Sequence, residues 1–151
     1  MSWRLLHVSL KMLCVAAALQ LSAQPEPGFF TTVDVFVVSD TPVAAWQVEL
    51  TERRGTMQIV GIESGDDSSF RDPPFYDRVA TMRGATDRIV LASFSLSEAE
   101  QLQRGRVRIA RLHVRTIGAA QPDYEARLVA AGTADGRPID AQLNLETQAE
   151  R

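Results

Sequence analysis

A short stretch, FRDPPFYDRVATM at residues 70–82, concentrates the side chains best suited to binding. Phe70, Phe75 and Tyr76 could stack on a sugar or anchor a protein partner, because aromatic rings bury a large apolar area. The competing interpretation is scaffold: two consecutive prolines stiffen the loop, and Phe75 and Tyr76 would cap the open end of the fold. Adjacent aromatics in a stiff loop point in different directions, so we favour scaffold, with Tyr76 or Phe70 exposed.

Acidic residues surround this stretch and raise the question of calcium binding or acid–base catalysis. They are Glu63, Asp66, Asp67, Asp72 and Asp77. Carboxylate oxygens suit Ca²⁺, but the spacing of an EF-hand loop is absent, so calcium stands only as the alternative to a protein without cofactors. A glycoside hydrolase needs two carboxylates at a fixed separation, which the sequence does not reveal. Asp72 and Asp77 remain binding candidates beside the aromatic residues.

Nucleophilic catalysis finds little support in the residue types present. Cys14 is the only cysteine, and His113 is the only histidine after residue 23. A serine triad needs an oriented base beside an exposed nucleophile, and no Gly-x-Ser-x-Gly turn is present. One histidine without cysteines also cannot form the usual structural zinc site. The sequence therefore predicts a protein that is not an enzyme and has no metal ligands.

Arginines crowd one segment: they are Arg104, Arg106, Arg108, Arg111 and Arg115. Arg108 and Arg111 are binding candidates for an acidic partner or an anionic sugar. The alternative is an outward strand face whose arginines pair with Asp and Glu on neighbouring strands. The net negative charge of the chain favours that alternative and argues against nucleic-acid binding.

The elements that must position these residues show an apolar period of two, which predicts β-strands. The strands are expected at residues 30–40, 43–52, 56–64, 88–96, 106–116, 124–132 and 139–147. A glycine within a strand indicates a bulge or a bend at Gly61. A second bulge is predicted near Ile109–Ala110, where the alternation changes phase. In the fourth strand Val90, Ala92, Phe94 and Leu96 share one face.

Turn signals separate these strands, and only one segment looks helical. SEAEQLQRG places Ser97 three residues before Glu100, the pattern of a capping box. Asp135–Gly136 is a hairpin signal, and residues 64–87 show no period. About 7–9 short strands without alternating helices predict an all-β fold, an antiparallel β-sandwich of the jelly-roll type.

The order of these segments resembles the cohesin-like domains of bacterial extracellular proteins, β-sandwiches that are similar to carbohydrate-binding modules. The matching positions, across roughly residues 30–147, are Trp46, Val48, Leu50, Ile59, Val60, Gly65, Ile89, Leu91, Ala92, Phe94, Gly105, Ile109, Ala110, Leu112 and Val114. Glu52 and Arg53 depart from the Tyr-Asp pair that follows the first of these strands in the family. The resemblance implies a non-catalytic binding role, and no residue motif for a dockerin partner carries over.

The N-terminus has the order of a secretory signal peptide. Arg4 and Lys11 precede an apolar core, Met12 to Leu19, which is far shorter than the roughly 20 residues of a membrane span. Cleavage is expected after Ala23. Loss of Arg4 and Lys11 then lowers the formal net charge from −3 to −5. A cysteine-free domain does not depend on disulfides, although we expect it to be secreted, periplasmic or extracellular.

The sequence thus predicts four parts: a signal peptide at 1–23, a tether at 24–29, a cohesin-like sandwich at 30–147 and a polar tail at 148–151. The expected function is binding of an extracellular protein, with a polysaccharide bound by the aromatic loop 70–77 as the alternative. A glycoside-acting enzyme is the third interpretation.

Overall fold

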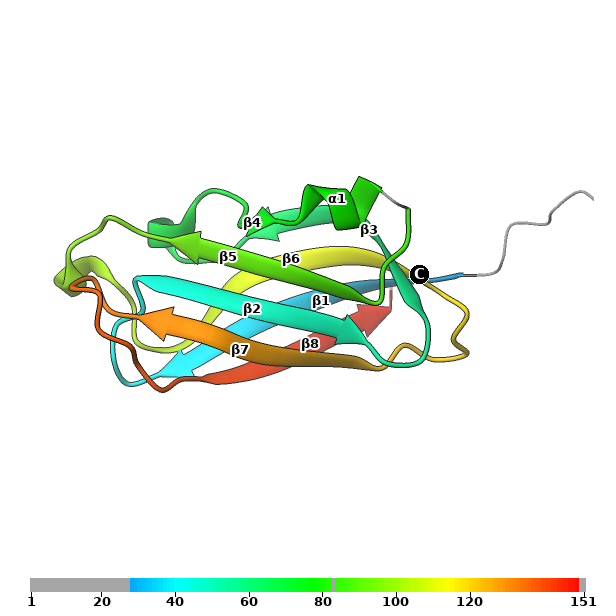
Figure 1. Cartoon of the computed structure of the whole chain (residues 1–151). Coiled ribbons are helices and arrows are strands. Elements are labelled where there is room, and N and C mark those ends of the chain that lie inside the picture. The colour runs from blue at the N-terminus through cyan, green and yellow to red at the C-terminus, as the bar shows by residue number, and fades with distance from the viewer. Residues whose placement is uncertain (1–27, 83, 150–151) are drawn as a thin grey trace, which may run out of the picture.

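The protein is a β-sandwich of two four-stranded antiparallel sheets (Figure 1). The computed structural model describes residues 28–82 and 84–149, so the predicted signal segment lies outside them. The predicted all-β sandwich is confirmed, while the jelly-roll type stays a prediction. No helix within the described residues is both long and apolar enough to cross a membrane.

The sheet that faces the viewer in Figure 1 is called the front sheet, and the other the back sheet. The front sheet contains, in order, β4 (Phe75–Tyr76), β5 (Arg88–Phe94), β2 (Ala45–Glu52) and β7 (Tyr124–Gly132). The back sheet contains, in order, β3 (Thr56–Ser64), β6 (Gly105–Ile117), β1 (Gly28–Ser39) and β8 (Gln142–Ala149). β1 and β8 therefore take in residues that we had assigned to the tether and the polar tail.

The core lies between the sheets and is formed by the inward-facing side chains of the strands. β1 contributes Val33, Val35 and Val37, and β2 contributes Trp46, Val48 and Leu50, as their spacing predicts. Other fully buried side chains are Met57, Ile89, Leu91, Ile109, Leu112 and Val114. Each such side chain stabilises the fold by about 1.5–3 kcal/mol relative to exposure, which makes the interior the main source of stability.

The bulge predicted near Ile109–Ala110 is confirmed, and the bulge or bend expected at Gly61 is a bulge next to that glycine. The pairing of β1 with β6 shifts so that Val35 faces Ala110 and Phe36 faces Arg108, which leaves Ile109 as the extra residue. The pairing of β3 with β6 shifts between Ile59 and Gly61. An extra residue rephases the side chains that follow it, so Ile109 and Ala110 are both buried although they are neighbours in sequence.

Polar groups close one end of the sandwich. The Tyr124 hydroxyl lies 2.7 Å from the hydroxyl of Thr116, which is fully buried. The buried carboxylate of Glu52 accepts backbone N–H groups from Arg54 and Asp123, each at 2.9 Å. These bonds join the turn after β2 to the start of β7, and they satisfy groups that would otherwise be costly to bury.

One local prediction was wrong. The Ser97–Glu100 capping box does not form: the short 3₁₀ helix η2 (Ala99–Gln101) has Glu98 at its N-cap, without a side-chain bond. The hairpin signal at Asp135–Gly136 is confirmed locally, because Gly132 and Pro138 form an antiparallel bridge across this turn before the chain continues to β8 in the other sheet. The non-periodic segment contains η1 (Ser68–Phe70), strand β4 and α1 (Arg78–Met82), because these elements are too short to leave a period.

Candidate functional site

An apolar groove lies on the outer face of the front sheet. It is at the end of the sheet where β5 and β7 terminate, and Figure 1 shows these two strand ends. It has a volume of about 460 Å³. Its lining is Ala45, Trp46, Gln47, Phe75, Ala92, Ser93, Phe94, Ala130, Ala131, Gly132, Thr133, Gly136 and Pro138. None of these side chains is titratable, so the groove is suited to contact and not to acid–base chemistry.

Two stacked aromatic rings form one wall of the groove. Phe75 of β4 and Phe94 of β5 lie with ring centroids 6.2 Å apart and planes 8° from parallel. Their side chains remain 68% and 57% exposed. Large apolar side chains that stay exposed beside a concave surface are typical of interaction sites.

Small side chains make much of the floor of the groove, because each of three neighbouring strands presents an alanine there. Ala92 of β5 and Ala130 of β7 both pair with Gln47 of β2, and Ala45 pairs with Phe94. The strand end at Gly132 and the turn that follows it form the opposite wall. The short alanine side chains therefore leave a hollow between the phenylalanine pair and the turn after β7.

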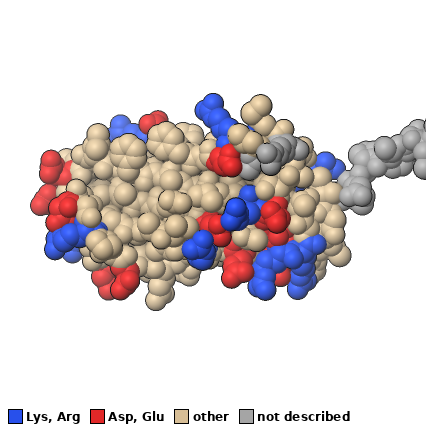
Figure 2. Space-filling view, viewed as in Figure 1, with Lys and Arg blue, Asp and Glu red and all other residues tan. Residues whose placement is uncertain are grey.

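The other half of the same face is charged. Glu49 on β2 lies between Arg88 of β5 and Arg127 of β7, at 3.2 and 3.3 Å. Arg53 and Glu125 form a further, exposed pair. Figure 2 shows a broad uncharged area over the groove end of the face and charged side chains toward the other end and along the rim. The front sheet thus offers an apolar area bordered by charge.

Of the candidate binding residues in the loop 70–77, only Phe75 lines the groove. Phe70 is 5% exposed and packs edge-on against Trp46, at 6.3 Å between ring centroids. Of the two candidates for exposure, Tyr76 and Phe70, Phe70 is buried, because η1 turns its ring into the core. Phe75 lies on the front sheet beside the groove, so the expectation that it caps an open end of the sandwich was also wrong.

The remaining predicted residues of this loop do not line the groove. Tyr76 follows Phe75 on the short strand β4, points to the other side of it and is 37% exposed. Asp72 is exposed. Asp77 accepts the backbone N–H of Val79 at 2.9 Å and so caps the first turn of α1. No role in binding follows from these contacts.

Arg108 and Arg111 belong to an ion-pair network on the outer face of the back sheet. Arg111 holds Asp34 through two bonds, Nε to Oδ1 at 2.7 Å and Nη2 to Oδ2 at 2.8 Å. Arg108 lies 3.3 Å from the same carboxylate and also pairs with Asp66. The hydrogen bond from Arg111 holds the pKa of Asp34 below its ordinary value, and the same bond raises the pKa of Arg111.

The network confirms that the arginine face is paired across strands. Arg106 lies 2.5 Å from Glu146 of β8, and His113 lies 2.8 Å from Glu63 of β3. The guanidinium of Arg106 also lies 3.4 Å from the centre of the Phe36 ring. Cross-strand charge pairs of this kind stabilise a sheet face and leave little unpaired positive charge for an anionic ligand.

The acidic residues proposed for calcium do not converge. Asp66 pairs with Arg108, and Asp67 is buried and accepts the N–H of Ser69 at 2.8 Å. In the part of the chain that the structure describes, no three His, Cys, Asp or Glu side chains lie close enough to hold a metal ion. The geometry gives the calcium alternative no support.

Sequence reasoning missed most of the groove, including Phe94, the alanine floor and Pro138. The sequence of β5 did contain a signal for this site, because the side chains on both faces of the strand are apolar. Ile89 and Leu91 fill the core, so Val90, Ala92 and Phe94 must face outward. Leu96, predicted on that face just beyond the strand, is 91% exposed.

No family model, curated protein or solved structure matches this chain. The function must therefore be argued from the geometry of the chain itself.

Proposed function

We propose that this protein is a secreted, non-catalytic module that binds another extracellular protein through the groove of the front sheet. The observation that carries the proposal is the groove itself: an apolar hollow with a stacked, exposed Phe75–Phe94 pair and no titratable lining. The signal-like N-terminus and the resemblance to cohesin-like binding domains support the same function.

The chemistry of the groove favours a protein over a polysaccharide. Protein interfaces combine an apolar, aromatic centre with a polar rim, as this face does. A sugar site needs aromatic faces together with several hydrogen-bonding groups, and the only polar side chains along the groove that carry oxygen are Gln47, Ser93 and Thr133.

The test is recovery of a partner from the secreted fraction of the source organism. The full chain, expressed through an export pathway with a C-terminal tag, would be compared with the double variant Phe75→Ala, Phe94→Ala. The matched control is Phe29→Ala, because Phe29 is 47% exposed and lies outside the groove. Each chain would be tested with and without a calcium chelator and on a polysaccharide array.

A protein recovered by the wild type and the control, and lost from the folded double variant, is the expected result. Retention of that protein by the double variant would place the contact elsewhere on the molecule. Binding to the polysaccharide array alone, lost in the double variant, would replace the protein partner by a sugar.

A further inference from the structure

A charged hollow lies next to the apolar groove, at the end of the sandwich. This second hollow, about 430 Å³, lies among the loops that follow β1, β5 and β7. Thr133 lines both hollows, and the turn after β7 contributes residues to each of them. A ligand that fills the groove and extends past this turn would contact the charged groups of the second hollow.

The charges in the second hollow do not balance internally. Asp135 and Arg137 pair with each other at 2.7 Å. Glu98 and Glu100 are exposed and form no ion pair within residues 28–82 and 84–149, and Arg104 is the only other cation in the lining. The pairing of Asp135 with Arg137 leaves the two glutamates in excess over Arg104.

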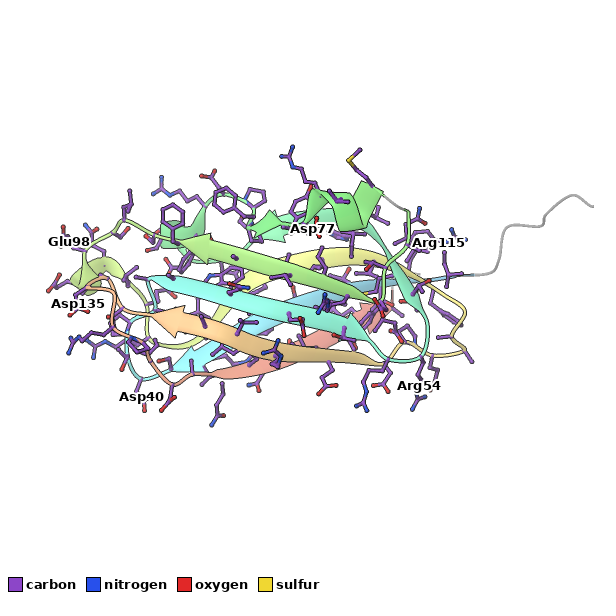
Figure 3. The ribbon with its side chains drawn as sticks, in the orientation of Figure 1. Asp40, Arg54, Asp77, Glu98, Arg115 and Asp135 are labelled. Carbon is purple, nitrogen blue, oxygen red and sulfur yellow. The ribbon has the colours of Figure 1, made fainter. Side chains whose placement is uncertain are left out.

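Two further carboxylates increase the acidic excess at this end. Asp40 and Asp140 line a neighbouring hollow of about 270 Å³, which contains no basic residue. Figure 3 shows Asp40, Glu98 and Asp135 at the same end of the molecule. Together the two hollows hold five carboxylates against two guanidinium groups. A negative rim thus lies at the same end of the molecule as the groove, and it favours positive charge on an incoming partner.

We infer that the partner of this module presents an apolar or aromatic side chain for the groove and, next to it, arginine or lysine for the acidic rim around Glu98 and Glu100. This inference rests on the proposed function and names the partner's chemistry. The apolar anchor supplies most of the binding energy, since desolvated apolar contacts at the centre of an interface dominate it. The basic residue speeds encounter and selects the partner, as charges on a rim do.

A second copy of the chain fits this surface less well than a segment of another protein. A two-fold dimer places the same patch of both copies in contact. The arginines on this face, Arg88 and Arg127, already pair with Glu49, so the same patch of a second copy is poorly suited to neutralise the acidic rim. A segment of another protein can supply both a protruding apolar side chain and a cation.

The probe is a random linear-peptide library displayed on phage, selected on the full exported chain. The selected consensus peptide is then synthesised, and its Kd is measured at low and high salt against four chains. They are the wild type, Phe75→Ala with Phe94→Ala, Glu98→Gln with Glu100→Gln, and the control Glu125→Gln. Glu125 is an exposed carboxylate at the charged end of the same sheet, outside both hollows.

We expect the consensus to pair an aromatic or aliphatic residue with arginine or lysine. Loss of the two phenylalanines should weaken binding about tenfold or more. Loss of the two glutamate charges should weaken it roughly threefold to tenfold at low salt and reduce its dependence on salt. Glu125→Gln should leave the Kd unchanged.

The outcomes separate this inference from the proposed function. A consensus with an apolar anchor but no basic residue, or indifference to the Glu98 and Glu100 changes, would overturn the inference and keep the groove as a protein-binding site. Peptides unaffected by the phenylalanine changes, or no selected peptide at all, would count against both. A dimer in sedimentation that the phenylalanine changes dissociate would show that a second copy covers the groove, and would overturn the inference.

Discussion

The rings of Phe75 and Phe94 stack nearly parallel, with centroids 6.2 Å apart, on the outer face of a sheet whose inner face packs against the core. The pair joins β4 to β5 and forms the wall of an apolar groove. Stacked aromatic pairs contribute about 0.5–1.5 kcal/mol beyond the area that they bury. Both residues are more than half exposed. The two rings therefore contribute more to the apolar surface of the protein than to the stability of its core.

The first prediction separates binding from stability at this pair. Phe94→Ala should lower the free energy of unfolding by no more than about 1.5 kcal/mol, because the ring loses mainly its contact with Phe75. Urea unfolding followed by circular dichroism measures this change. A loss of several kcal/mol would show that the ring supports the core.

Phe70→Ala should behave in the opposite way. The Phe70 ring is buried and packs on Trp46, so its removal leaves a cavity and should cost about 3–5 kcal/mol of unfolding free energy. Tryptophan fluorescence during urea unfolding measures the cost and reports on the Trp46 environment. An effect below about 1 kcal/mol would contradict the core position of Phe70.

Asp34 should make stability depend on acid pH. Its pKa is held below the ordinary value of 3.8 by the hydrogen bond from Arg111. The stability that the carboxylate contributes is therefore present above pH 3.8 and is lost as the pH falls through the lower pKa of the folded state. Asp34→Asn should cost about 1–3 kcal/mol at neutral pH.

The check is the free energy of unfolding of wild type and Asp34→Asn from neutral pH to below pH 3.8. The difference between the two chains should shrink at the acid end. Glu146→Gln is the control, because Glu146 pairs with Arg106 but is more exposed. A constant difference across the range would show that the charge of Asp34 contributes nothing.

Tyr124 should have the opposite pH dependence. Burial raises the pKa of its hydroxyl above 10.0, so the neutral form stabilises the fold below that pH and this stability is lost as the pH rises through the raised pKa. Tyr124→Phe should cost about 1–2 kcal/mol at neutral pH, because the buried Thr116 hydroxyl loses its partner. Unfolding of both chains up to alkaline pH measures this, and a wild type that resists alkali no worse than Tyr124→Phe would contradict it.

Much of the fold follows directly from local pattern. A period of two identifies strands such as β1 and β2, because successive side chains on a strand point to opposite faces. The change of phase at Ile109 predicts its bulge for the same reason. The pattern does not predict β4 and α1, because two and five residues are too few to show a period.

The local sequence pattern is not enough to predict the candidate site. Alternation in β5 groups Val90, Ala92 and Phe94 on one face, but when both faces are apolar it does not say which one is buried. That choice depends on the neighbouring strands, which put Ile89 and Leu91 against the core. Likewise, nothing near Phe75 in the sequence indicates that Phe94 and Ala130 line the same groove. They meet because antiparallel pairing brings distant segments of chain to one level of the sheet, and a groove exists only where those segments lie side by side.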